Sequence, residues 1–133
     1  MAENVEIKNL YETAVKYASS FGKSFTFAPE DIPALEEILQ YYYEDMAKSR
    51  PTERQMWSMA LIWGAFLGET MLSGYCRQYG FEWVPEEDQP VITKPGGGTL
   101  APVSKVFKRL HNGPEDSVVT YYNVMQDLLS REV

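Results

Sequence analysis

The sequence predicts an α+β fold, in which about five helices pack around a long central helix beside a small antiparallel sheet near residues 81–101. Two observations carry this prediction. Apolar residues recur every three or four positions along most of the chain, but beyond Gly80 the period changes to two. At 133 residues, 44% hydrophobic and 23% charged, the chain has the size and composition of a single globular domain, residues 1–133.

The central helix is predicted from the most apolar run of the chain, residues 56–72. We expect this helix to extend over residues 51–79, with Gly80 as its stop and with Ser49 or Arg50 near its cap. It is apolar on more than one side, as a helix is when neighbours cover it.

Two glycines lie one turn apart in this run, at Gly64 and Gly68. Glycine costs about 1 kcal/mol in a helix interior relative to alanine, so the pair indicates that another element packs closely here. A membrane span is the rival interpretation, since residues 56–76 have about the 20 residues that cross a bilayer. Glu69 within the run and the lack of a strong basic flank disfavour it.

Two amphipathic helices are expected before the central one, over residues 5–20 and from Pro29 or Asp31 to about Lys48. The segment 24–27 alternates polar and aromatic residues and is a candidate short strand. Four carboxylates of the second helix fall mostly off its apolar stripe, and we interpret them as a solvated acidic face rather than a binding surface: Glu36, Glu37, Glu44 and Asp45.

Beyond Gly80, short stretches of β-favouring residues are separated by stretches rich in turn residues. This pattern predicts strands at 81–84 and 91–94, extended structure at 100–101, and helices at 102–112 and from Pro114 onward.

The charge balance and the few reactive side chains limit the classes of function. A net charge of −7 without a basic stripe argues against binding nucleic acid or anionic membranes and favours basic partners. The single Cys76 permits no intrachain disulfide and no Cys-based zinc site, and we expect it to be an inert thiol. We interpret the single His111 as a surface residue at a helix end, and we expect no catalytic residue, metal or cofactor. No secretory signal is visible at the N-terminus, so we expect a cytoplasmic protein.

One segment departs from the acidic balance. Residues 89–114 contain no acidic side chain but include Lys94, Lys105 and Arg109. This segment either binds an anionic ligand or balances neighbouring acids internally. Glu69 needs a cation if it faces inward, and Arg109 or Lys105 could supply one as a structural tie.

The functional alternative to that tie is a pocket formed by Glu69, Trp83 and Arg109. The candidate ligand-binding residues are therefore Lys94, Lys105, Arg109, Trp83 and Glu69.

Several short motifs resemble those of a family of small, mostly bacterial domains of unknown function. They are a Gly-x-x-Leu-Gly-Glu helix ending at Glu69, a Trp-bearing strand at Trp83, and a Pro-x-x-Lys-Val helix beginning at Pro102. The resemblance spans about residues 25–125. It implies no established catalytic residues. Similar small acidic α+β proteins also occur as immunity proteins that neutralise toxins.

We therefore expect a non-catalytic cytoplasmic interaction protein, immunity-like or regulatory, that is a monomer or weak dimer and binds a protein partner. The acidic or aromatic surface would meet that partner. The alternative is a small module for anionic ligands, or an unrecognised enzyme, with its site at Lys94, Lys105 and Arg109.

Overall fold

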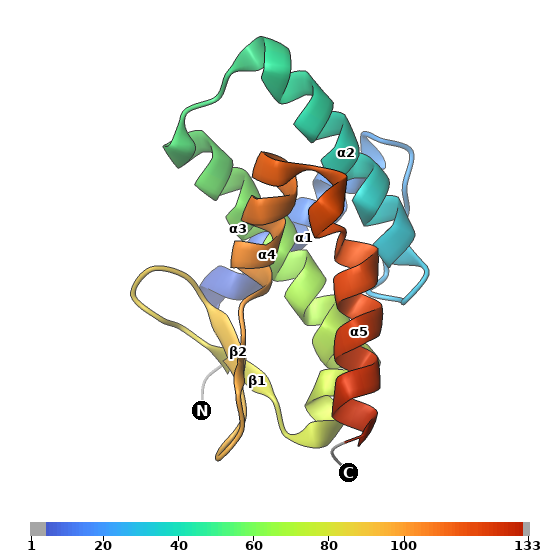
Figure 1. Ribbon diagram of the computed structural model, residues 1–133, viewed down its shortest axis with the longest axis vertical. Helices are drawn as coiled ribbons and strands as arrows, with labels where there is room; N and C mark the ends of the chain where they lie inside the picture. The colour runs from blue at the N-terminus through green and yellow to red at the C-terminus, as the bar shows by residue number, and fades with distance from the viewer. Residues whose placement is uncertain (1–4, 132–133) are drawn as a thin grey trace.

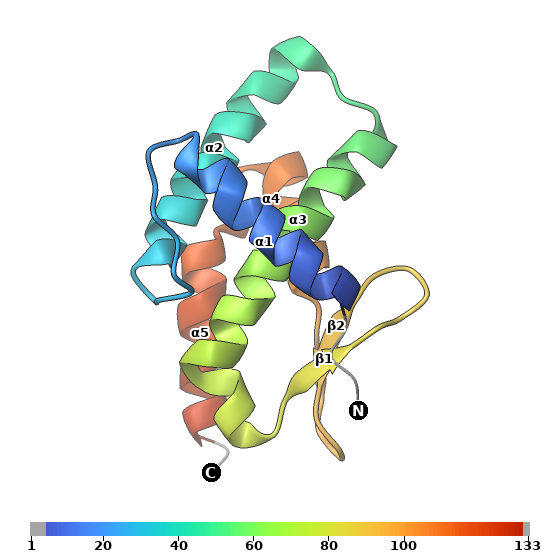
Figure 2. The same ribbon diagram turned by 180° about the vertical axis from the view of Figure 1, so that it is seen from behind.

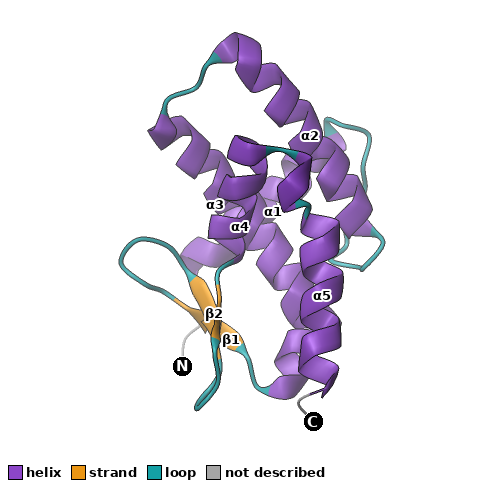
Figure 3. Cartoon of the chain, in the orientation of Figure 1, coloured by secondary structure: helices purple, strands orange, loops and turns teal. Residues whose placement is uncertain are grey.

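The computed structural model describes residues 5–131 and confirms the α+β fold (Figures 1 and 3). Within this range a three-stranded antiparallel sheet accompanies five α-helices. The helices are α1 (Val5–Ser19), α2 (Asp31–Ser49), α3 (Glu53–Met71), α4 (Pro102–Asn112) and α5 (Val118–Arg131). The strands are β1 (Glu82–Val84), β2 (Val91–Thr93) and β3 (Thr99–Leu100).

Helix α3 is the centre of the molecule, as predicted. It packs against both α1 and α4, and α1 crosses it on the side seen in Figure 2. Its buried side chains join those of α2, α4 and α5 in one hydrophobic core, which includes Trp63, Phe66, Leu67 and Met71. None of the helices within residues 5–131 combines the length and apolarity needed to cross a bilayer.

The close approach predicted at Gly64 and Gly68 is confirmed. A Cβ placed on Gly64 would lie 2.5 Å from the Cα of Val103 in α4. A Cβ on Gly68 would collide with the ring of Trp83 and lie 2.9 Å from Cγ of Pro102. The two glycines thus let α4 and the first strand approach the α3 backbone, which offsets their low helix propensity.

The two ends of the central helix were predicted with unequal success. Gly80 ends it at φ 93°, as expected, after a π-helical turn η1 (Leu72–Cys76) and a 3-10 turn η2 (Arg77–Tyr79). The predicted cap at Ser49 or Arg50 was wrong. Thr52 caps α3 instead, accepting from the backbone N–H of Gln55 at 3.1 Å, while the Gln55 side chain accepts from Thr52 N–H at 2.8 Å. This reciprocal capping box satisfies donors that neither Ser49 nor Arg50 reaches.

The candidate strand at 24–27 is not a strand. Its alternation arises from packing, because Phe25 stacks on Phe66 with ring centroids 4.4 Å apart. The carboxylate of Asp31 accepts from the backbone N–H groups of Thr26 and Ala28, at 2.7 and 3.1 Å. The segment is therefore a loop held by a side chain rather than by a partner strand.

The sheet lies where the period of two predicted it. Strand β2 is central and pairs antiparallel with both neighbours. Trp83 of β1 lies opposite Ile92, and Ile92 also lies opposite Leu100 of β3.

The last helix begins later than predicted, because Pro114–Asp116 forms a separate 3-10 turn, η3. The Ser117 hydroxyl then accepts from the first turn of α5, at Val119 N–H and Thr120 N–H.

Candidate functional site

Of the three residues of the predicted pocket, the structure brings Glu69 and Trp83 together and places Arg109 elsewhere. The indole N–H of Trp83 donates to Glu69 at 3.1 Å, so these two residues do meet. The cation beside Glu69 is Arg77, at 3.4 Å, and the expectation that Arg109 or Lys105 would supply it was wrong. Arg77 lies eight residues further along the chain, just beyond the π-helical turn that follows α3, and its side chain reaches back to Glu69.

Arg77 also binds Glu82 of β1, with 2.7 Å between Nε and the carboxylate. These hydrogen bonds hold the pKa of Glu82 below its usual value. Glu69, Arg77, Glu82 and Trp83 thus form a partly exposed cluster that connects the end of the central helix to the sheet.

The three candidate cations of residues 89–114 point to three different partners. Lys94 lies over the ring of Phe81, 5.3 Å from its centroid. Lys105 binds Asp116 at 3.1 Å and lies over the ring of Tyr121. Arg109 turns toward α2. Each positive charge is thus already engaged within the chain, which leaves less attraction for an anionic ligand.

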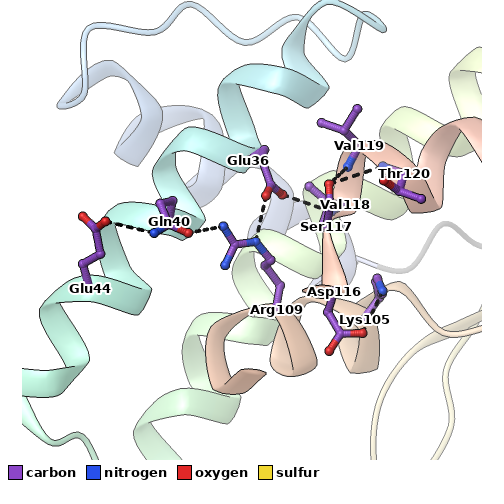
Figure 4. Close-up of polar contacts among 10 residues, drawn as sticks. All are labelled: Glu36, Gln40, Glu44, Lys105, Arg109, Asp116, Ser117, Val118, Val119 and Thr120. Atoms are coloured by element: carbon purple, nitrogen blue, oxygen red, sulfur yellow. Dashed lines mark hydrogen bonds and ion pairs between the residues drawn. The ribbon is translucent and has the colours of Figure 1, made fainter. Parts of the chain in front are cut away.

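Arg109 is the centre of a buried polar network (Figure 4). Its side chain is only 1% exposed. Nε donates to Glu36 at 2.9 Å, Nη2 donates to the side-chain oxygen of Gln40, and the guanidinium lies 5.9 Å from the centroid of the Tyr43 ring. The third nitrogen, Nη1, is buried and has no hydrogen-bond partner among the described residues.

The network joins three helices through one carboxylate. Glu36, on α2, binds Arg109 on α4 with one oxygen and accepts from Val118 N–H, at 3.0 Å, with the other. Val118 is the first residue of α5, where unpaired N–H groups and the helix dipole favour a negative charge. The prediction that Glu36 belongs to a solvated face was therefore wrong, because the residues that enclose it come from the other end of the sequence.

An open groove of about 400 Å³ runs beside this network, between α2 and the α4–η3 junction. Three carboxylates and one aromatic ring line it together with an amide, a guanidinium and a proline: Glu36, Glu37, Glu44, Tyr41, Gln40, Arg109 and Pro114. Glu37 and Tyr41 are exposed, at 69% for the Glu37 side chain and 55% for Tyr41, and Glu44 is exposed as well. The acidic surface predicted from the sequence thus exists, and it is hollowed where α2 passes α4.

Sequence reasoning missed Tyr41. The signal was the run Tyr41-Tyr42-Tyr43, because three successive helical side chains point in directions about 100° apart and cannot all be buried against one neighbour. In the structure Tyr42 packs toward the core, Tyr43 lies against Arg109, and Tyr41 faces solvent.

Two further reactive side chains, Cys76 and His111, lie in different settings. Burial raises the pKa of the Cys76 thiol to about 12, so this thiol is protonated at neutral pH. His111 is exposed, and its Nδ1 lies 2.9 Å from the Asn112 side chain. No group of three or more His, Cys, Asp or Glu residues in this part of the chain is arranged to hold a metal ion.

Comparison with protein-family models, with curated proteins and with solved structures finds no match to this chain. The resemblance to a family of small bacterial domains stays a prediction. The function is therefore argued from the groove and its neighbours alone.

Proposed function

We propose that this protein is a non-catalytic interaction protein that binds a basic protein partner through the groove beside α2. The observation that carries this proposal is the exposed Tyr41, which lies in the groove with Glu37 before it and Glu44 after it. Exposed aromatic side chains are enriched at protein interfaces, where they bury a large area at low entropic cost. The carboxylates around Tyr41 would select a positively charged partner and speed its approach.

An immunity-like or regulatory protein of the bacterial cytoplasm is the most concrete form of this proposal. Such a protein acts by covering part of its partner, which requires a shaped and charged surface but no catalytic group. The net charge of −7 suits a basic target. The alternative, an anionic-ligand module at Lys94, Lys105 and Arg109, has less support because all three cations already have partners within the chain.

Affinity capture with the full chain and two charge-matched variants tests the proposal. Glu44→Lys reverses a charge in the groove, whereas Glu86→Lys makes the same change in the exposed loop between β1 and β2. We expect a basic protein that is retained by the wild type and by Glu86→Lys but lost from Glu44→Lys. The purified pair should then form a complex whose affinity falls as salt rises.

The proposal fails if the same proteins are retained by all three forms of the chain. It also fails if the retained partner is acidic, or if its purified complex is insensitive to salt.

A further inference from the structure

Helix α2 already binds one guanidinium group on its inner side. Glu36 supplies a carboxylate at 2.9 Å from Arg109, Gln40 supplies a carbonyl oxygen, and Tyr43 supplies a ring face. These three residues are spaced i, i+4 and i+7, so they form one stripe along the helix. We call Glu36, Gln40 and Tyr43 the inner stripe.

The same spacing recurs one residue further along. Glu37, Tyr41 and Glu44 form an outer stripe with the order carboxylate, aromatic, carboxylate, and it lines the outer side of the same groove. The chemistry that holds Arg109 is therefore present again, but facing solvent.

The outer stripe is only weakly engaged by the rest of the chain. Lys23 lies 3.3 Å from Glu37, in an exposed pair of the kind that contributes little. Glu44 accepts from Gln40 at 2.9 Å, and no ion pair reaches it within residues 5–131. Tyr41 is nevertheless held in place, since Phe21 and Tyr42 pack against it edge to face with ring centroids 5.4 and 5.6 Å away. These contacts restrict the ring, which lowers the conformational entropy that is lost when a ligand binds to it.

We propose that the outer stripe binds an arginine side chain of the partner protein, with the guanidinium stacked on Tyr41 and paired with Glu44. This inference rests on the proposed function and names the chemistry that the groove recognises. Arginine fits better than lysine because its flat, weakly hydrated guanidinium both stacks on an aromatic face and pairs with a carboxylate through two parallel hydrogen bonds.

A second and independent observation favours a polypeptide over a small cation. Nη1 of Arg109 (Figure 4) is a buried donor without an acceptor among residues 5–131, and Arg109 is one of the residues that line the groove. An unpaired buried donor costs free energy that an incoming acceptor recovers. A peptide carries main-chain carbonyls beside its arginine, whereas a polyamine carries no acceptor. The volume of about 400 Å³ lies within the range of sites that hold such a group.

Titration of the full chain by NMR with short blocked peptides tests this inference. The probes are acetyl-Gly-Arg-Gly-Arg-Gly-amide, the same peptide with lysine in place of arginine, and spermidine. We expect saturable shifts of the backbone amides of Glu37, Tyr41 and Glu44 with the arginine peptide. A dissociation constant of about 1 mM is the scale for so small a contact. We expect binding about threefold tighter than that of the lysine peptide.

Two exposed tyrosines provide a matched pair of variants. Tyr41→Ala should weaken binding of the arginine peptide by about two- to fivefold, as expected for one exposed cation–π contact. Tyr17→Ala removes a tyrosine of similar exposure, 45% against 55%, from α1 and should leave binding unchanged. Wild-type-like amide spectra of both variants would show that neither change unfolds the protein.

The inference is overturned if arginine and lysine peptides bind equally, if spermidine binds more tightly than either, or if Tyr41→Ala has no effect. It is also overturned if no saturable shift occurs at about 10 mM peptide, where a site of the expected strength would be nearly filled. If Glu44→Lys still abolished capture of the partner, the proposed function would stand, and only the inference that the groove recognises an arginine side chain would be lost.

Discussion

Glu36 and Glu69 are both partly buried carboxylates with an arginine partner, but they obtain that partner in different ways. Glu69 meets Arg77, eight residues away, at a site where the Arg77 side chain is 42% exposed. Glu36 meets Arg109, 73 residues away, and that guanidinium is 1% exposed. The local pair needs only the end of α3 and the two turns that follow it, whereas the distant pair exists only when α2, α4 and α5 are assembled. We therefore expect the two pairs to differ in their contribution to stability.

Removing Glu36 should have the largest effect. Glu36→Ala leaves the Arg109 guanidinium buried without its counter-charge and also frees Val118 N–H. Loss of one partner of a buried pair costs about 3–5 kcal/mol, and we expect the lower end because the Glu36 side chain is 21% exposed. Urea unfolding measures the loss. The neighbouring Glu37→Ala should change the unfolding free energy by less than about 0.5 kcal/mol. Equal losses in the two variants would contradict the comparison.

Neutralising Glu69 should have a much smaller effect. In Glu69→Gln the amide oxygen can still accept from the Trp83 indole, so only the attraction to Arg77 is lost. A half-exposed pair of this kind contributes about 0.5 kcal/mol. The same urea measurement would detect it, and a loss as large as that of Glu36→Ala would show that the local pair is as important as the distant one.

Arg77→Ala should have a small effect on stability, no smaller than that of Glu69→Gln because Arg77 pairs with both Glu69 and Glu82, and a visible effect on titration. Hydrogen bonds from Arg77 hold the pKa of Glu82 below its usual value, so their removal should raise that pKa toward the ordinary range. Because the pKa is lowered in the folded protein, this contribution to stability is present above the unfolded pKa. It is lost as the pH falls through the folded pKa. NMR titration of the Glu82 carboxyl carbon measures the shift, and an unchanged value in Arg77→Ala would contradict the assignment.

The same contrast explains how far the sequence could predict this protein. The positions of the helices, the stop at Gly80 and the change to a sheet were all predictable, because periodicity and turn residues act within a few positions. The cap of α3 was misplaced by two or three residues, although Thr52 with Gln55 three residues later is the sequence signature of a capping box.

Part of the candidate site was also predictable. The contact between Glu69 and Trp83 was contained in one of the two predicted alternatives, whereas the acidic residues of α2 were predicted as a solvated face rather than as part of a site. Tyr41 and the partner of Arg109 did not, because both depend on how α2 is rotated against α4. A rotation of the helix by one residue, about 100°, would bring the outer stripe to the position that the inner stripe occupies.

By itself, the sequence determined a helix-rich α+β domain whose centre carries two glycines for close packing. The helices and strands depend on local periodicity, and the close packing depends on the fact that glycine has no side chain. Only the tertiary structure decided which acidic stripe of α2 is enclosed and which stays open. That choice depends on an arginine 69 to 73 residues away, and a contact of that range forms only when the packed core brings the two helices together.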